Sequence, residues 1–282
     1  MSGTLHLVAV PIGNPDDITL RALATLRAVA VVAAEDTRHF ATLARHHDLA
    51  TRAVSYHDHN ETSRSRELLE RLRAGDDVAL VRDAGTPLVS DPGYRLVRAA
   101  LAEGIAVTSV PGPSAVTAAL VASGLPPHPF RFIGFLPRTS AARRAALEAV
   151  RDDPATLVAF EAPRRLVAAM GDARRVLGDR PACLARNLTK PHERWMRATL
   201  SELQAALEGE TLAEGEVRGE VTVVIGGADR AAAAGASAEE DAEALLAAGT
   251  PSRAVQDLLV RRHGLAKRDA YALVLRLRDR ER

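Results

Sequence analysis

Short apolar runs alternate with amphipathic helical patterns through the first half of the chain. Runs rich in Val, Ile, Leu and Ala predict strands at residues 5–10, 29–34, 53–56, 78–82 and 105–110. Helices are predicted between them: one with Leu20, Leu23 and Leu26 as its apolar face and Asp16 or Asp17 as its cap, one at residues 61–73 that stops at Gly75, and one from Asp91-Pro92 to Gly104. This alternation is typical of a mostly parallel sheet covered by helices.

A second α/β unit is predicted after the proline cluster at residues 126–129. Its candidate strands are residues 130–135, 156–160, 182–186 and 221–225, and its candidate helices are residues 141–150, 164–177 and 200–207. Two such domains joined by a short connector leave a cleft between them, and clefts of this kind are favoured sites for small molecules.

The pattern changes again after Gly226-Gly227. An alanine-rich linker at residues 231–236 precedes an acidic helix at 239–248, a helix from Thr250-Pro251 to Gly264, and another from Lys267 to about Arg280. Residues 251–282 carry nine Lys or Arg against four Asp or Glu, a net charge of +5. We expect a small all-α, basic, helix-turn-helix-like module, with a solvated pair of dimerisation helices as the alternative. The expected domains are therefore 1–122, 123–228 and 229–282.

Composition narrows the class of protein. The 282 residues are 47% hydrophobic and 26% charged, which argues against disorder, and the formal net charge is only +1. Lys190 and Lys267 are the two lysines, so arginine, which suits phosphate and carboxylate, supplies nearly all the positive charge. The simpler explanation of this arginine content is a genomic codon bias toward Arg and Ala. Aromatic residues make up 3%, which argues against a base-stacking platform.

The cysteine count and the N-terminus indicate the compartment. Cys183 is the single cysteine, so an internal disulfide is excluded, and its apolar neighbours predict a buried thiol. The first apolar run is broken at Pro11, too early for a signal peptide, and no later stretch reaches the length of a membrane span. We expect a soluble, cytoplasmic protein with no membrane partner.

Several common functional motifs are missing from the sequence. There is no GxxxxGK[ST] loop, no GxGxxG and no GxSxG, so nucleotide triphosphate hydrolysis, Rossmann dinucleotide binding and serine hydrolase chemistry have no support. One cluster of potential metal ligands is present, at His57, Asp58, His59 and Glu61. No further ligand motif accompanies them, so we expect no metal and interpret them as polar lining of a cleft.

Three loops rich in Gly, Pro and small polar residues follow predicted strands, at residues 11–15, 83–87 and 111–115. Ligands of open α/β sheets bind at the carboxyl ends of the strands. Small side chains let a ligand approach the main chain, and Asp83 can accept a hydrogen bond from an amine or a ribose.

Seven segments in order carry a resemblance to a known family. They are VPIGNPDDITLRAL at 10–23, AAEDTRH at 33–39, SYHDHNE at 55–61, DAGTPLVSDPGYRLVRAA at 83–100, PGPSA at 111–115, GFLPR at 134–138 and LTK at 188–190. Over about residues 4–226 the chain resembles the ribosomal RNA small subunit methyltransferase I family of the tetrapyrrole methylase superfamily, the class III methyltransferases. The basic tail looks like the terminal helical domain of that family. The chain departs from the family pattern at Phe160, Arg164 and Asn187.

The resemblance implies S-adenosylmethionine as methyl donor, held in the cleft between two α/β domains of a homodimer. It implies as acceptor the 2'-hydroxyl of a cytidine ribose in the decoding region of 16S rRNA, within the small ribosomal subunit or its precursor. Carried over by motif, the donor contacts are Ile12, Gly13, Asp83, Ala84, Gly85, Thr86, Ser114, Ala115 and Phe160.

Six further side chains are candidates for catalysis and RNA binding. Glu161 or Lys190 is expected to orient or deprotonate the ribose hydroxyl. A donor-binding or structural acid is the alternative for Glu161, and a phosphate contact for Lys190. The expected RNA contacts are Arg38, His57, Arg164 and Arg165; the alternative for Arg38 is pairing with Glu35 or Asp36.

Two other functions compete with rRNA methylation. One is methylation of a tetrapyrrole, as in fold relatives, which gives no use for the basic tail. The other is a noncatalytic RNA-binding or ribosome-assembly factor that retains the donor pocket.

Overall fold

The first of two sheets is parallel throughout. The computed structural model describes residues 2–90, 93–214, 219–228, 238–247 and 250–280. In the first sheet the strands stand in the order β3-β2-β4-β1-β5, and each strand coincides with one of the predicted apolar runs. Their bounds are β1 Thr4–Val8, β2 Val31–Ala34, β3 Ala53–Ser55, β4 Val78–Val81 and β5 Ala106–Val110. Every residue of β2 and β4 is buried, because helices cover both faces.

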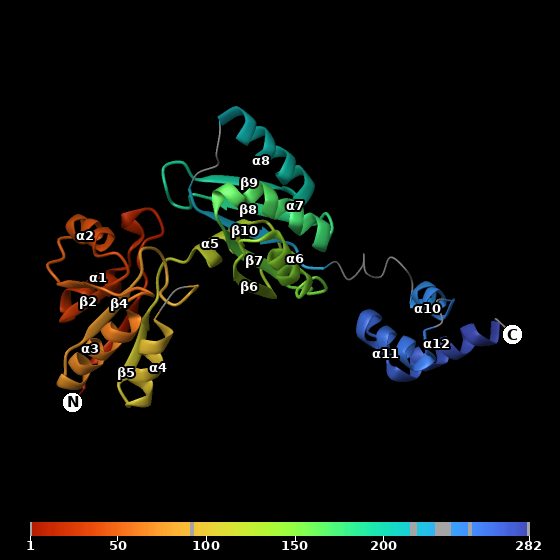
Figure 1. The fold of residues 1–282 in the computed structure, drawn as a ribbon, viewed down its shortest axis with the longest axis horizontal. Coiled ribbons are helices and arrows are strands. Elements are labelled where there is room, and N and C mark those ends of the chain that lie inside the picture. Colours follow the sequence, from red (N-terminus) through yellow and green to blue (C-terminus); the bar gives the residue numbers. More distant parts are fainter. Residues whose placement is uncertain (1, 91–92, 215–218, 229–237, 248–249, 281–282) are drawn as a thin grey trace.

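Two helices lie on each face of this sheet (Figure 1). α1 (Leu20–Ala28) and α2 (Thr37–His46) share one apolar cluster with the strands, and α3 (Glu61–Ala74) and α4 (Tyr94–Ala102) share the other. α3 ends as predicted at Gly75, whose φ of 100° lies in the left-handed region that favours glycine.

The start of α1 differs from the prediction. Asp16 and Asp17 belong to a separate 3-10 turn (Pro15–Asp17), and the cap of α1 is Thr19, whose Oγ1 accepts a hydrogen bond from the Ala22 amide at 3.1 Å. Leu20, expected on the apolar face, is 86% exposed, because the later start of the helix turns Ala22 and Leu26 to the core. Asp91 and Pro92 lie outside the described residues.

The second sheet is mixed, with the order β6-β7-β10-β8-β9 and one parallel pair, β6 with β7. Its strands are β6 Phe130–Phe135, β7 Thr156–Glu161, β8 Pro181–Arg186, β9 Arg194–Thr199 and β10 Val221–Ile225. Four of them match the predicted runs. β9 was not predicted, because the sequence RWMRAT at this edge strand interrupts its apolar positions with arginines.

Helices cover the two faces of this second sheet unequally. α6 (Ser140–Glu148), α7 (Leu166–Leu177) and α8 (Leu200–Glu214) pack on one face, and α5 (Ala115–Ala122) packs on the other, near the buried Cys183. A 3-10 turn (Pro163–Arg165) precedes α7. α5 precedes the expected boundary at residue 122, yet its buried residues pack on strands β7 and β10 of the second sheet.

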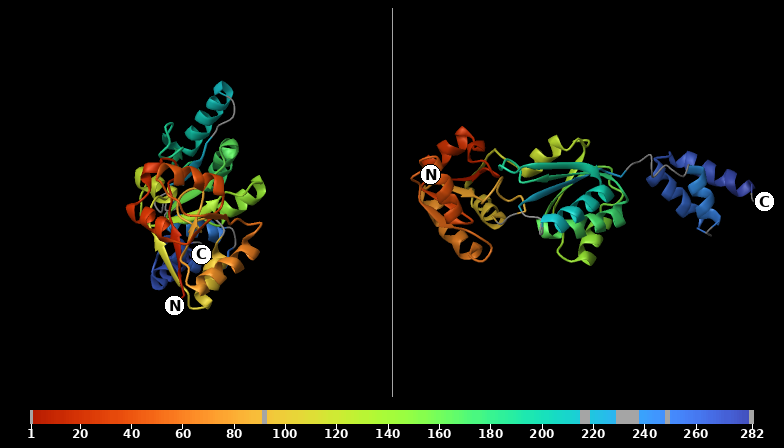
Figure 2. Two further views of the ribbon diagram at one scale, coloured as in Figure 1. Left: turned by 90° about the vertical axis from the view of Figure 1, so that its left-hand side faces the viewer. Right: turned by 90° about the horizontal axis from the view of Figure 1, so that it is seen from above.

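The C-terminal helices share a core of their own (Figure 2). They are α10 (Ala238–Ala247), α11 (Ser252–His263) and α12 (Lys267–Arg280), close to the predicted bounds. The predicted alanine-rich linker lies outside the described residues. Within the described ranges, no helix combines the length and the apolar character needed to cross a membrane.

Candidate active site between the two sheets

The three predicted loops meet at the carboxyl edge of the first sheet. Val10 and Gly85 exchange two backbone hydrogen bonds, each of 3.0 Å, and Thr86 Oγ1 donates to the Pro113 carbonyl at 3.1 Å. Gly85 has a φ of +76°, and a Cβ there would lie 3.3 Å from Ile12 Cγ2. Direct contacts therefore join the three loops into one surface.

A cavity of about 240 Å³ lies between this surface and the second sheet. Eight of the nine predicted donor contacts line it: Ile12, Asp83, Ala84, Gly85, Thr86, Ser114, Ala115 and Phe160. A larger cavity of about 560 Å³ adjoins it and shares residues such as Ile12, Asp83 and Glu220. Gly13, the ninth predicted contact, lines the larger cavity. The structure thus brings the predicted donor contacts together.

A loop of the second sheet, residues 188–190, closes on the first loop. The Asn14 amide donates to Thr189 Oγ1 at 2.9 Å, and a Cβ on Gly13 would lie 2.7 Å from the Leu188 carbonyl oxygen. Lys190 also lines the larger cavity, where its Nζ donates to Glu220 Oε1 at 2.9 Å. Lys190 is therefore an ion-paired side chain at the wall of the cleft.

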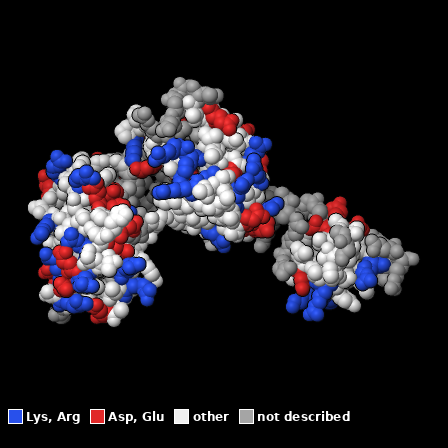
Figure 3. All heavy atoms as spheres, in the orientation of Figure 1, with Lys and Arg blue, Asp and Glu red and all other residues white. Residues whose placement is uncertain are grey.

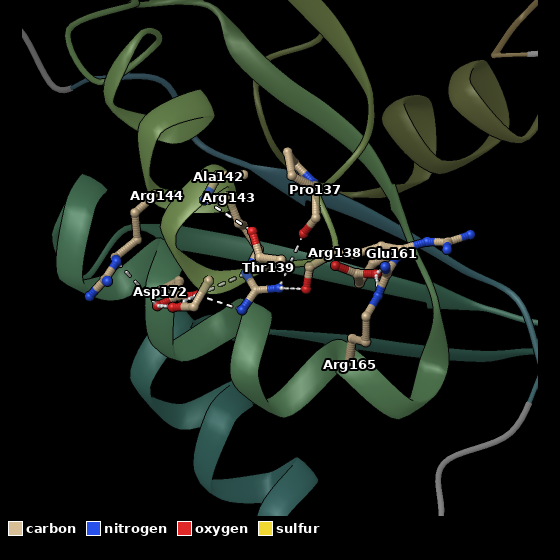
Figure 4. A network of polar contacts seen from close by, with 10 residues as sticks. Pro137, Arg138, Thr139, Ala142, Arg143, Arg144, Glu161, Arg165 and Asp172 are labelled. Atoms are coloured by element: carbon tan, nitrogen blue, oxygen red, sulfur yellow. Dashed lines mark hydrogen bonds and ion pairs between the residues drawn. The ribbon is translucent and has the colours of Figure 1, made fainter.

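Glu161 occupies a different position, behind the cavity wall. Its Oε1 accepts hydrogen bonds from the Ala162 amide at 2.6 Å and from Arg165 Nε at 2.8 Å (Figure 4). Its side chain is fully buried, and it is not among the described residues that line either cavity. Lys190 therefore lines a cavity, whereas Glu161 is buried in an ion pair with Arg165. Arg164 is exposed.

The predicted RNA contacts Arg38 and His57 line one open hollow of about 410 Å³ beside the cleft, together with Asp83. Asp36 caps α2, and its carboxylate accepts hydrogen bonds from the Arg38 amide at 2.8 Å and from Arg38 Nη2 at 2.7 Å. These hydrogen bonds hold the pKa of Asp36 well below its usual value. The pairing of Arg38 with Asp36 matches the alternative given for Arg38, and the guanidinium still stays exposed to solvent.

The motifs did not identify several other lining residues. Glu35, Arg82, Val89, Phe135, Glu220 and Val221 also line the smaller cavity. Glu35 lies inside the quoted segment 33–39 at the end of β2, so its position already contained a signal. Phe135 likewise lies inside the quoted segment 134–138. Glu220 carries no such signal, because the pairing of the second sheet brings it to the cleft.

Comparison with known proteins identifies the family. Residues 4–204 match the family described as Tetrapyrrole (Corrin/Porphyrin) Methylases. A Micromonospora olivasterospora protein named ribosomal RNA small subunit methyltransferase I is 52% identical over 280 residues, which cover 97% of this chain and 87% of that one. A Pseudomonas aeruginosa protein of the same name is 45% identical, covering 96% and 92%.

The chain belongs to the ribosomal RNA small subunit methyltransferase I family. The family is one of S-adenosylmethionine-dependent methyltransferases. A solved structure of uroporphyrin-III C-methyltransferase from Thermus thermophilus, complexed with S-adenosylhomocysteine, has a TM-score of 0.55 and 25% identity and covers 79% of this chain and 97% of that one. Cobalt precorrin-4 methyltransferase shares the fold, with a TM-score of 0.60, 21% identity and coverage of 79% and 94%. The predicted fold class, two α/β units of the tetrapyrrole methylase type followed by a helical module, is confirmed.

Proposed function

We propose that this methyltransferase transfers a methyl group from S-adenosylmethionine to the 2'-hydroxyl of a cytidine ribose in the decoding region of 16S rRNA. The observation that carries the proposal is the cavity between the two sheets, lined by eight of the nine predicted donor contacts. The rRNA methyltransferase names of relatives that align along nearly the whole chain support the class of substrate.

The lining of the cleft fits the proposed donor. Its carboxylates, among them Asp83 and Glu220, suit an amine and ribose hydroxyls, and Gly85, which has no side chain, also lines the cavity. Ile12, Val89 and Phe160 provide apolar surface for an adenine ring. When bound, S-adenosylmethionine supplies a methyl group that its sulfonium already activates.

The chain's own contribution is to align the acceptor hydroxyl, whose proton passes to water. We assign Lys190, ion-paired with Glu220 at the cavity wall, to orient the ribose hydroxyl and stabilise the negative charge that develops on its oxygen. Glu161 is buried and paired with Arg165, so we assign it to positioning Arg165 and the end of β7 and not to contact with the acceptor. Arg38, His57, Arg164 and the basic C-terminal module contact the RNA.

The proposed substrate, a small ribosomal subunit or its precursor, places the protein in the cytoplasm. The family resemblance also leads us to expect a homodimer.

The test incubates purified protein with labelled donor and small ribosomal subunits. The proposal predicts label in the 2'-O position of one cytidine of 16S rRNA. Binding of a porphyrinoid in a spectroscopic titration, without label in RNA, would support the tetrapyrrole interpretation instead. Donor binding without methylation of either substrate would support the noncatalytic interpretation. Either of these two results would overturn the proposal.

The two lysines provide a matched test of the catalytic assignment. Lys190→Ala is expected to slow single-turnover methylation about 100-fold or more while donor affinity changes less than about threefold. Lys267→Ala, which removes an exposed lysine in α12, is expected to leave the rate at saturating subunit concentration unchanged. If Lys190→Ala and Glu161→Gln both left the single-turnover rate and donor affinity intact, neither residue would have a catalytic role.

A further inference from the structure

Strand β6 carries one extra residue where it passes the cavity. Phe132 pairs with Val158, and the next paired residue, Phe135, pairs with Phe160, so three steps along β6 match two along β7. Gly134, with a φ of +71°, occupies this bulge. Successive side chains of a strand alternate between faces, so a regular strand would place Gly134, and not Phe135, on the face of Phe132. The bulge turns Phe135 toward the cleft.

The ring of Phe135 is both supported and accessible. Its centroid lies 5.3 Å from that of Phe160, which in turn lies 5.0 Å from that of Phe132. Phe135 lines the smaller cavity and yet is 57% exposed. An aromatic ring held against other rings offers a flat apolar surface whose order does not depend on a ligand.

The position of Phe135 favours the acceptor over the donor as its partner. Most predicted donor contacts, such as Asp83–Thr86 and Ser114, come from loops of the first sheet, and Phe160 is the one predicted contact on the second. Phe135 stands one strand farther out, on the edge strand β6 of the second sheet. An acceptor hydroxyl in a large RNA reaches the cavity from the solvent side. Phe135, which is 57% exposed, is accessible from that side. A nucleotide that presents its ribose this way leaves the base stack of the RNA, and an aromatic side chain replaces the missing stacking.

We infer that Phe135 is the stacking surface for the base of the nucleotide that this enzyme methylates. The inference rests on the proposed function and adds a residue that positions the substrate. The scarcity of aromatic residues counted against a stacking platform in general; the structure gathers three of the five phenylalanines of the chain at this one place.

The test compares variants of the full-length protein. Phe135→Ala and Phe135→Leu are expected to raise the KM for small ribosomal subunits about tenfold, because neither keeps a ring, whereas Phe135→Trp keeps the KM near that of the parent protein. Binding of S-adenosylhomocysteine, measured by calorimetry, is expected to stay within about twofold in all three. Phe130→Ala is the matched control: Phe130 lies on the same strand, is 43% exposed, and is not among the described residues that line either cavity.

Two results overturn the inference. Weaker binding of S-adenosylhomocysteine by Phe135→Ala would assign the ring to the donor. An unchanged KM for Phe135→Ala or Phe135→Leu would show that no base stacks there. Either result counts against Phe135 only if the parent protein labels rRNA ribose. If the parent protein does not label rRNA ribose, the proposed function itself fails, so the failure of the inference and the failure of the proposed function can be told apart.

Discussion

Gly13 shows how a single residue fixes the approach of the two units at the cleft. A Cβ at this position would meet the Leu188 carbonyl oxygen at 2.7 Å and Lys190 Cγ at 2.6 Å. Distances this short force one of the two segments to move, and the main chain of Leu188 cannot rotate away as a side chain can. Glycine here therefore allows the loop at residues 188–190 to lie against the first loop.

Gly13→Ala is expected to weaken binding of S-adenosylhomocysteine about tenfold, because a displacement of about 1 Å at a binding site is costly. Calorimetry checks the change. Gly209→Ala is the control, since Gly209 lies in α8 with nothing within 4 Å of its added Cβ, and alanine there is expected to be neutral or to stabilise the helix by up to about 1 kcal/mol. Equal donor affinity in Gly13→Ala and the parent protein would contradict the packing argument.

Cleft residues that lie in local sequence motifs could be predicted. Cleft residues that reach their position through the pairing of strands could not. Asp83, Gly85 and Ser114 stand directly after strands or in quoted motifs, so their meeting follows from parallel strand order. Phe135 lies in the quoted segment 134–138, but the bulge that turns it toward the cleft could not be predicted from that segment. Glu220 depends on the register of β10, which leaves no mark in a single sequence.

Among the elements, a buried ion pair joins α6 to α7 (Figure 4). Arg143 Nε donates to Asp172 Oδ2 at 2.9 Å, and Ser140 Oγ donates to the same carboxylate at 2.8 Å. Arg143 Nη1 also donates to the Pro137 carbonyl at 3.3 Å. Arg143 thus anchors the segment that follows Phe135 and leads into α6.

Removing one partner of this pair leaves a buried charge. Arg143→Met is expected to lower the free energy of unfolding by about 3–5 kcal/mol, measured by urea denaturation. The double variant Arg143→Met with Asp172→Leu is expected to recover most of that decrease, because no charge remains buried. A double variant as unstable as the single one would show that hydrogen bonds, and not the unpaired charge, dominate.

Most elements could be predicted because the pattern of apolar residues reflects their burial. Strands β2 and β4 are buried on both faces and appear as unbroken apolar runs. β9 could not be recognised in this way, since its position at the sheet edge leaves Arg194 and Arg197 exposed. α5 has only eight residues and is almost wholly apolar, so its sequence resembles a buried strand as much as a helix.

At the scale of the whole molecule, a formal net charge of +1 conceals an uneven distribution. Figure 3 shows Lys and Arg spread over the visible face of the part around the second sheet, whereas both signs are mixed on the part around the first. In α12, Lys267 and Arg268 are exposed at the first turn. This arrangement suits contacts with phosphates along a folded RNA.

Replacing both Lys267 and Arg268 with Ala is expected to weaken binding to small ribosomal subunits. The slope of log affinity against log salt is expected to fall by about 0.7–0.9 for each phosphate that the variant no longer neutralises. Filter binding at several salt concentrations checks the slope. Arg38→Ala provides the comparison for the cleft. It removes one exposed arginine of α2 where the double replacement removes two charges, so the salt slope is expected to fall by about half as much. An unchanged slope after the double replacement would exclude α12 from the interface.

The most direct test of the central claim maps ribose methylation in 16S rRNA from a strain that lacks the gene and from its parent. The proposed function predicts that one 2'-O-methylcytidine in the decoding region disappears in the deletion strain, returns with the parent gene, and fails to return with Lys190→Ala. Retention of every ribose methyl group in the deletion strain would contradict the proposal that this cleft methylates rRNA.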